Sequence, residues 1–280
     1  MSHISSHTVT TGSFTTHYVE AGNPDGVPVI LLHDGAWGGY GMLSWEPVIG
    51  YLESSWRLLM PDMLGFGHSD KAIYLDRPPY WSRVRQVTDF VAALGITDHH
   101  IVGTSFGGSV ALRGAASGEW SATTVTSIGG GGGPWRSQEG IDALSDLVPG
   151  REFIRDVVGM LVTNPDDFSD HIDKRLEASK IPGHYACLSA LRLRHPDSQP
   201  PRAEDPYPST LHGTTGVVAI EMTDDRIMQP GWSAEVTAAA PSVRAITMPG
   251  AHSPNLDNPA ALADILTTIF LGDNAEAHTP

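Results

Sequence analysis

One serine in the sequence has the surroundings of a catalytic nucleophile. Ser105 lies in the stretch GTSFGG, between Gly103 and Gly107, after the apolar run HIVGT and before a segment of helical character. A strand, a tight turn and a helix in that order hold a serine in a strained conformation with its hydroxyl exposed. The turn also leaves the amide of Phe106 at a helix N-terminus, where it can stabilise an oxyanion. Because a chain with 30 glycines also produces Gly-x-Ser-x-Gly by coincidence, a structural turn is the alternative.

A base and an acid for Ser105 are available farther along the chain. A serine hydroxyl is weakly nucleophilic unless a base takes its proton and an acid orients that base. In strand–turn–helix enzymes of this kind the acid and then the histidine follow the serine. His252, one of 13 histidines, lies between the last apolar run and the last amphipathic segment, where the base is expected. In EMTDDRIMQP we choose Asp225 as the acid and keep Asp224 as the alternative.

The segment LLHDGAWGG follows the third expected strand and is the expected source of a second oxyanion donor. Gly35 is the best candidate, because no side chain obstructs its N–H. His33 is expected to anchor the loop through hydrogen bonds. Asp34 is either a solvent-facing carboxylate or a charge at the substrate pocket, where it would disfavour anionic substrates.

Short apolar runs alternate with amphipathic segments through most of the chain. Nearly continuous apolar runs indicate strands buried on both faces, and they occupy residues 27–33, 56–62, 100–104, 123–129, 217–222 and 243–249. Residues 84–94 and 262–270 have helical spacing of apolar residues. Two alternating runs joined by Gly12 and Ser13 predict an antiparallel hairpin. The pattern predicts an α/β fold with a mostly parallel sheet, an antiparallel edge and helices on both faces.

A long interval between the runs at 123–129 and 217–222 breaks this rhythm. It opens with GGGGGPW, ends in a proline-rich stretch and has helical spacing between them, which predicts a helical lid over residues 134–212. The core then comprises residues 1–133 and 213–280. The glycine run is either a flexible linker or a hinge that passes close to a ligand. Trp37 and Trp135, near the oxyanion loop and the hinge, are expected to contact a medium-sized apolar or aromatic substrate.

Composition excludes several other classes of protein. The 280 residues suffice for one α/β domain with an insertion. The formal net charge of −15 repels nucleic acid and anionic membranes, and no signal peptide or run of about 18 apolar residues is readable. One cysteine, Cys187, provides neither a disulfide nor a metal cluster. We expect a cytoplasmic protein with a small-molecule substrate, no metal and no cofactor, and homodimerisation stays open.

The segments LLHDGAWGG, PDMLGFGHSD, VGTSFGG, DDRIMQP and GAHSPNLDNP follow one another in this order along the chain. With them the whole chain resembles the α/β-hydrolase superfamily. PDMLGFGHSDK and LVTNPDDFSDHIDKRLEASKIPG add a closer resemblance to the meta-cleavage-product hydrolases, which cut a carbon–carbon bond next to a ketone in ring-fission products. The resemblance implies an eight-stranded core and a triad of Ser105, Asp225 and His252. It also implies an oxyanion hole made by the amides of Gly35 and Phe106.

Substrate contacts are less closely defined by the resemblance. Arg175 falls where the meta-cleavage-product hydrolases have an arginine facing the substrate from the lid, and it is equally a candidate for a surface residue of a lid helix. Thr104 replaces an asparagine common before the nucleophile, and Asp34 and Trp37 stand in a segment that is glycine-rich in that subfamily. Ser253 replaces a frequent tryptophan. We expect Thr104, Asp34 and Trp37 to line the substrate site, whose ligand stays open.

The predicted function is that of a serine hydrolase acting on a ketone-adjacent carbon–carbon bond or a related ester. A carboxylesterase or lactonase for an apolar ester is the main alternative. A cofactor-free lyase or oxygenase on the same fold and a non-catalytic binding protein are further alternatives, although a binding protein would be expected to lose a triad member. Epoxide hydrolases and haloalkane dehalogenases need an aspartate where this chain has Ser105.

Overall fold

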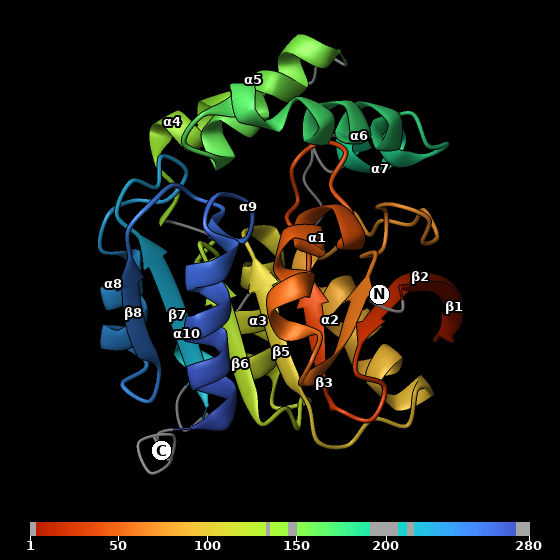
Figure 1. The fold of residues 1–280 in the computed structure, drawn as a ribbon, viewed down its shortest axis with the longest axis vertical. Coiled ribbons are helices and arrows are strands. Elements are labelled where there is room, and N and C mark those ends of the chain that lie inside the picture. Colours follow the sequence, from red (N-terminus) through yellow and green to blue (C-terminus); the bar gives the residue numbers. More distant parts are fainter. Residues whose placement is uncertain (1–3, 133–134, 145–149, 191–206, 212–215, 273–280) are drawn as a thin grey trace.

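The central feature of the fold is an eight-stranded sheet, seen in a computed structural model that describes residues 4–132, 135–144, 150–190, 207–211 and 216–272. The strand order among these residues is β1-β2-β4-β3-β5-β6-β7-β8, and every pair from β4 to β8 is parallel. The strands are β1 (Ser5–Thr11), β2 (Phe14–Gly22), β3 (Val27–Leu32), β4 (Trp56–Pro61), β5 (His100–Thr104), β6 (Thr124–Ile128), β7 (Val217–Met222) and β8 (Arg244–Met248) (Figure 1). The predicted mostly parallel sheet is confirmed.

An antiparallel hairpin forms one edge of this sheet, as predicted. β1 and β2 pair with Thr11 opposite Phe14, and Gly12 between them has a φ of 61°, which glycine adopts without strain. β2 also pairs antiparallel with β4, so it joins the hairpin to the parallel strands.

Helices cover both faces of the sheet, because its central strands are apolar on both sides. One face carries α1 (Gly41–Leu52), α9 (Pro254–Asp257) and α10 (Pro259–Leu271), and the other carries α2 (Pro79–Ala93), α3 (Phe106–Ser117) and α8 (Trp232–Ala239) (Figure 1). The apolar core is divided in the same way. Trp45 of α1 belongs to the cluster on the first face, and Phe90 of α2 belongs to the cluster on the second.

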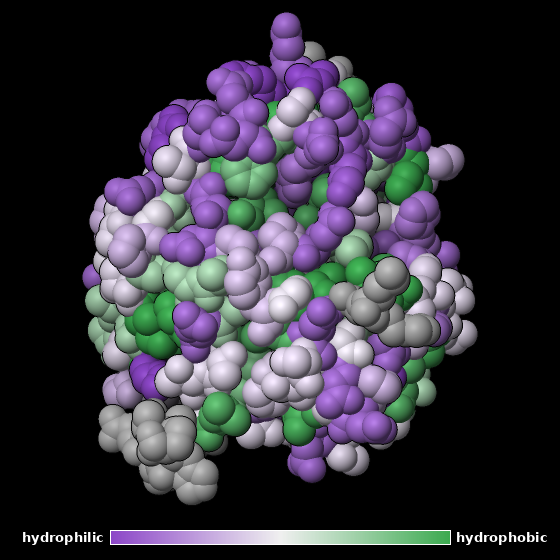
Figure 2. All heavy atoms as spheres, viewed as in Figure 1, coloured by the Kyte–Doolittle hydropathy of each residue, from purple (hydrophilic) through white to green (hydrophobic). Residues whose placement is uncertain are grey.

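Helices inserted between β6 and β7 form a further layer over one edge of the sheet, and we call α4–α7 the insertion (Figure 1). They are α4 (Gln138–Ala143), α5 (Arg151–Leu161), α6 (Ser169–Ser179) and α7 (His184–Ala190), with 3-10 turns at Pro165–Phe168 and Ser209–Leu211. Hydrophilic residues gather over its outer side (Figure 2). The insertion falls within the lid range expected at 134–212, of which residues 134, 145–149, 191–206 and 212 lie outside the described residues.

The carboxyl ends of the parallel strands bring the expected site residues to one edge of the sheet. Loops at that edge form the binding sites of open α/β folds. β5 leads into Ser105, β7 is followed by Asp225 and β8 is followed by His252. The insertion lies above this edge (Figure 1).

The described helices are short. The longest, α2, has 15 residues, and none within the described ranges is long and apolar enough to cross a membrane. In the same ranges no three or more histidine, cysteine, aspartate or glutamate side chains are grouped so that they could hold a metal ion.

Candidate active site

Ser105 occupies a strained turn between β5 and α3. Its φ is 54° and its ψ is −116°, and among the described residues it is the one non-glycine residue with positive φ. Such a backbone costs roughly 1–3 kcal/mol and persists where surrounding contacts enforce it. Here the Ser105 amide donates to Ile128 O at 2.7 Å, and a Cβ on Gly107 would lie 2.5 Å from Leu32 O. The expected strand–turn–helix is therefore present.

His252 and Asp225 form a buried pair on the loops after β8 and β7. His252 Nδ1 donates to Asp225 Oδ2 at 2.8 Å, and the two side chains are 0% and 3% exposed. The other Asp225 oxygen, Oδ1, accepts the amides of Ile227 at 2.8 Å and Met228 at 3.0 Å, so the carboxylate is held in place. Asp224 is exposed, and its carboxylate accepts a hydrogen bond from the hydroxyl of its own neighbour, Thr223. The structure thus pairs His252 with Asp225 and not with Asp224.

The remaining ring nitrogen of His252 is unused. Nε2 is buried and has no hydrogen-bond partner. In the neutral ring with its proton on Nδ1, toward Asp225, this second nitrogen is an acceptor. The bond that we expected between the Ser105 hydroxyl and this nitrogen is not formed. Hydrogen bonds of this kind are often long or misaligned in ligand-free sites. The His252 ring lies beside Gly129, where a Cβ would be 2.9 Å from Cε1, and Ser105 is bonded to the adjacent Ile128.

Two backbone amides beside Ser105 have no hydrogen-bond acceptor among the described residues. They belong to Gly35 and Phe106. Their neighbours are engaged, since the Ala36 amide donates to Asp34 Oδ1 at 2.8 Å and the Gly107 amide donates to His33 O at 3.1 Å. A Cβ on Gly35 would lie 2.6 Å from Phe106 Cβ, so the two residues are in direct contact. Free N–H groups that face a cavity together can bind a developing negative charge.

His33 fixes the loop after β3, as expected. Its Nδ1 donates to Asp34 O at 2.6 Å, and its Nε2 accepts the Met63 amide at 2.9 Å. This arrangement requires a neutral ring, and burial lowers the pKa of His33, which favours that form. The histidine therefore links the β3 loop to the loop after β4.

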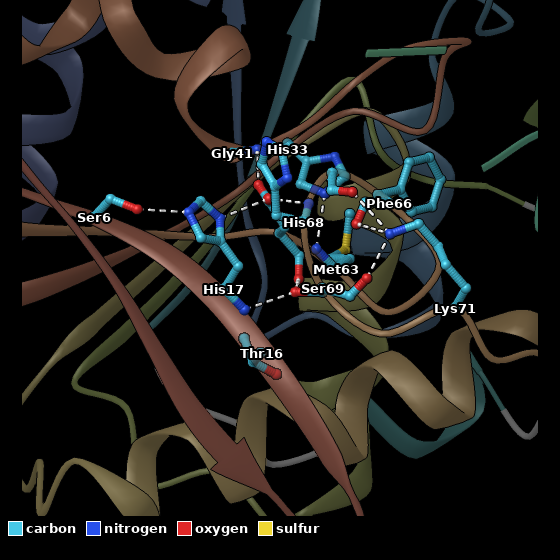
Figure 3. A network of polar contacts seen from close by, with 12 residues as sticks. Ser6, Thr16, His17, His33, Gly41, Met63, Phe66, His68, Ser69 and Lys71 are labelled. Atoms are coloured by element: carbon cyan, nitrogen blue, oxygen red, sulfur yellow. Dashed lines mark hydrogen bonds and ion pairs between the residues drawn. The ribbon is translucent and has the colours of Figure 1, made fainter. Parts of the chain in front are cut away.

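A polar network also fastens the loop after β4, which carries the PDMLGFGHSDK motif (Figure 3). The buried Asp62 carboxylate accepts His17 Nδ1 and the His68 amide, both at 2.8 Å. Lys71 Nζ donates to the carbonyl of Phe66 at 3.3 Å, and further donates to carbonyls next along the same loop. These contacts hold Phe66 against the cavity described next, a role for the motif that sequence reasoning did not assign.

A cavity of about 260 Å³ lies between this edge of the sheet and the insertion. Ser105, Gly35 and Phe106 line it, together with Gly129 beside His252. The wall is predominantly apolar and aromatic, including Trp37, Phe66, Tyr80, Phe153, Val157 and Met228. α5 and α7 contribute Phe153, Val157, Leu161 and Leu188, so the insertion forms part of the cavity wall.

Arg175 and Asp34 form a buried ion pair instead of lining this cavity. Arg175 Nη2 donates to Asp34 Oδ2 at 2.7 Å and Nη1 donates to Oδ1 at 3.2 Å, and the two side chains are 0% and 2% exposed. Arg175 Nη1 also donates to Trp37 O at 3.2 Å, and its Nε donates to His171 Nε2 at 2.8 Å. For each of them the sequence left two alternatives open, a contact with the substrate or a place at the surface. The structure shows neither placement, since both side chains are buried in the pair and neither belongs to the cavity wall.

The Asp34 carboxylate is further stabilised within the β3 loop. It accepts the Ala36 amide and the Ser44 hydroxyl, each at 2.8 Å. Burial alone would raise the pKa of Asp34, but the Arg175 guanidinium outweighs it and holds that pKa well below its usual range. Burial and the same guanidinium lower the pKa of His171 to about 3, so this ring stays neutral and accepts from Arg175.

The other expected substrate residues differ in their placement. Trp37 lines the cavity, with its ring against His184 at a centroid distance of 5.4 Å. Thr104 is fully buried behind Ser105, where its hydroxyl contacts Asn255 Oδ1 at 3.2 Å. Trp135 packs edge-on against Tyr207, with the two ring centroids 6.0 Å apart, and it is not among the residues of the cavity wall. Of these three, the structure brings Trp37 to the cavity.

Sequence reasoning missed the arginine that does line the cavity. Arg136 follows Trp135 directly after the glycine run, and its half-buried side chain forms part of the wall. Only its position beside that run could have drawn attention to it. Tyr80 and Phe153 were also missed, because they come from α2 and α5, which meet the site only in the folded chain.

Comparison with known families agrees with this architecture. The sequence profile of the alpha/beta hydrolase family matches residues 29–265, which is most of the chain. The chain belongs to the alpha/beta hydrolase family. The family suggested by the order of the motifs is thereby confirmed.

Curated relatives in this family carry the names of hydrolases of ring-fission products. The chain is 28% identical over 169 residues to 2-hydroxymuconate semialdehyde hydrolase of Pseudomonas sp. (strain CF600). The matched region covers 59% of this chain and 59% of the relative. It is 38% identical over 108 residues to 2-hydroxy-6-oxo-6-(2'-aminophenyl)hexa-2,4-dienoic acid hydrolase of Metapseudomonas resinovorans. This matched region covers 37% of this chain and 35% of the relative. Both matches span less than two thirds of the relative's length.

Solved structures share the fold over nearly the whole chain. The meta-cleavage product hydrolase from Pseudomonas fluorescens IP01 superposes with a TM-score of 0.80 at 22% identity, covering 95% of this chain and 97% of that one. The carboxylesterase CesB from Bacillus subtilis superposes with a TM-score of 0.76 at 15% identity, covering 96% of this chain and 92% of that one. Such identities show a common fold, and proteins named for different reactions have it.

Proposed function

We propose that the protein is a serine hydrolase in which Ser105, His252 and Asp225 form the catalytic triad. The observation that carries the proposal is the state of His252. Its Nδ1 is bound to Asp225, and its buried Nε2 is an acceptor without a partner, on a ring that lies beside the Ser105 turn. A base in that state can take the Ser105 proton, and the carboxylate stabilises the imidazolium that forms.

The free amides of Gly35 and Phe106 supply the oxyanion hole in this proposal. Attack by Ser105 on a carbonyl carbon places negative charge on the carbonyl oxygen. Both residues line the cavity beside Ser105, and their amides have no competing acceptor among the described residues. Loss of one such donor typically raises the barrier by ~3 kcal/mol.

The reaction that we propose is hydrolysis of a carbon–carbon bond next to a ketone. A 2-hydroxy-6-oxo-dienoate first moves its hydroxyl proton to carbon, with His252 assisting, which gives the keto form. Ser105 then attacks the 6-oxo carbon while His252 takes its proton. The adjacent carbon–carbon bond breaks, its electron pair leaves on the enolate fragment, and His252 protonates that fragment. Water finally attacks the acyl-serine, which releases a carboxylic acid and free Ser105.

Two observations support this substrate class. The cavity, at about 260 Å³, is near the lower size of ordinary ligand pockets of roughly 300 Å³ or more, and its wall suits an aromatic or alkyl ketone. The relatives named above are hydrolases of a muconate semialdehyde and of a 6-oxo-dienoic acid.

A carboxylesterase is the second candidate function. The observation that favours it is the Arg175–Asp34 pair, because the arginine expected to bind a substrate carboxylate is occupied by another residue. An apolar cavity also suits the acyl chain of a neutral ester.

A paired substrate assay tests the proposal. We expect the wild type to convert 2-hydroxy-6-oxo-6-phenylhexa-2,4-dienoate to benzoate, measured by chromatography of the products. Ser105→Ala should lower kcat by at least about 10³-fold, because the acyl-enzyme can no longer form. p-Nitrophenyl butyrate serves as the ester for comparison.

Each outcome separates the candidates. Turnover of the ester without any benzoate from the dienoate would leave the carboxylesterase as the function. Full activity of Ser105→Ala on either compound would contradict the triad itself.

A further inference from the structure

Arg136 is the one charged side chain in the cavity wall formed by the described residues. The other polar groups of that wall are the hydroxyls of Ser105, Ser109 and Tyr80 and the indole N–H of Trp37, all of them uncharged. Ser109 already donates to Gly130 O at 2.8 Å. A half-buried guanidinium among aromatic and aliphatic groups loses part of its hydration, which is unfavourable unless an anion takes its place.

No carboxylate of the described residues pairs with Arg136, and its guanidinium makes no hydrogen bond within them. Three other arginines behave differently. Arg226 pairs with Glu139, Arg175 pairs with Asp34, and Arg151 pairs with Asp173. Arg83, which has no carboxylate partner among the described residues, donates instead to Pro79 O at 2.9 Å and to Leu64 O at 2.7 Å.

The backbone of Arg136 is fixed beside the loop after β7 that carries Asp225. It forms an isolated antiparallel bridge with Met228, and its carbonyl accepts Gln229 Nε2 at 3.0 Å. The next residue, Ser137, donates its amide to Ile227 O at 2.9 Å. Ile227 and Met228 are the residues whose amides hold the Asp225 carboxylate. Arg136 therefore has a defined position relative to the proposed triad.

We propose that Arg136 binds the carboxylate of the substrate, and so selects substrates that carry an anionic group on the part of the molecule held in the cavity. The inference rests on the proposed function for the site around Ser105. A guanidinium recognises a planar carboxylate through two parallel hydrogen bonds. Arg136 would supply the charge that Arg175 cannot supply, because Arg175 is committed to Asp34.

A pair of esters with the same shape and different charge tests this selection. The anionic ester is mono-p-nitrophenyl glutarate, and p-nitrophenyl 5-methylhexanoate replaces its carboxylate with an isopropyl group. For Arg136→Gln we expect kcat/KM on the anionic ester to fall by at least about tenfold, because a charge-assisted bond pair is lost. On the neutral ester kcat/KM should change by less than about twofold, which also shows that the site is intact.

Two further variants serve as controls. Arg226→Gln removes a nearby exposed arginine that is paired with Glu139. It should leave the ratio of kcat/KM on the anionic ester to kcat/KM on the neutral ester unchanged. Arg136→Lys keeps the charge but cannot form the bidentate pair of hydrogen bonds. Its ratio of kcat/KM values on the two esters should therefore lie between the ratios of the wild type and Arg136→Gln.

A binding measurement keeps the inference testable if neither ester is cleaved. In Ser105→Ala protein, titration calorimetry should show 5-phenylpentanoate binding weaken by at least about tenfold when Arg136→Gln is added, while the uncharged 5-phenylpentanamide is unaffected. Equal loss for the acid and the amide, or an unchanged ester ratio in Arg136→Gln, would overturn the role of Arg136. The proposed triad would survive that result, and it would fail only if Ser105→Ala stayed active.

Discussion

At the scale of single residues, the choice between two adjacent aspartates decides how the base is oriented. Asp225 reaches His252 Nδ1 at 2.8 Å and is itself held by two backbone amides. Asp224 is exposed and contacts Thr223. The pair therefore offers a matched comparison in which one carboxylate orients the imidazole and the other does not.

We predict that Asp225→Asn lowers kcat by about 10⁴-fold, because an amide at this position favours the wrong tautomer of the histidine. Asp224→Asn should change kcat by less than about twofold, since surface substitutions of this kind leave the site unchanged. Steady-state kinetics on whichever substrate the wild type turns over measures both. A loss in Asp224→Asn as large as that in Asp225→Asn would mean that the two roles are assigned incorrectly.

The candidate triad could be predicted from the order of its residues along the chain, whereas contacts between distant segments could not be predicted. Ser105, Asp225 and His252 each follow a strand, and parallel strands place such residues at one edge. The partner of Arg175 lies 141 residues away in Asp34, and no local pattern links the two. For the same reason Arg136 was missed, and the sequence could not decide between a substrate contact and a surface position for Arg175.

At the scale of elements, α6 is attached to the loop after β3 by one buried ion pair. Arg175 of α6 reaches Asp34 and Trp37 O in that loop, and a Cβ on Gly38 would collide with the Arg175 backbone. Figure 1 shows the loop between β3 and α1 reaching up to α6. The loop that presents the Gly35 amide thus depends on the insertion for its position.

We predict that Arg175→Met lowers the free energy of unfolding by ~3–5 kcal/mol, because it leaves the Asp34 carboxylate buried without a counter-ion. Adding Asp34→Asn removes that charge and should restore a large part of the loss. Arg151→Met, which breaks an exposed pair with Asp173, should cost about 1 kcal/mol or less. Urea unfolding at neutral pH measures all three, and equal losses in Arg175→Met and Arg151→Met would contradict the buried-pair argument.

For the whole molecule, the fold could be predicted from the sequence because the central strands are apolar on both faces, whereas the helices are apolar on one face. The runs expected at 27–33, 100–104 and 217–222 coincide with β3, β5 and β7. The cavity was not readable, because its wall combines residues of the core with residues of the insertion. Its size, and the arginine that the described residues place in its wall, arise only when the two parts are packed together.

In the proposed mechanism, Ser105 is a nucleophile that the rest of the molecule activates. Covalent labelling with a fluorophosphonate, followed by mass spectrometry of the intact protein and of its peptides, tests this most directly. We predict one label on the wild type, located on Ser105, no label on Ser105→Ala, and labelling of His252→Ala slowed by at least about 10³-fold. Equal labelling of wild type and Ser105→Ala, or a label on another residue, would contradict the account.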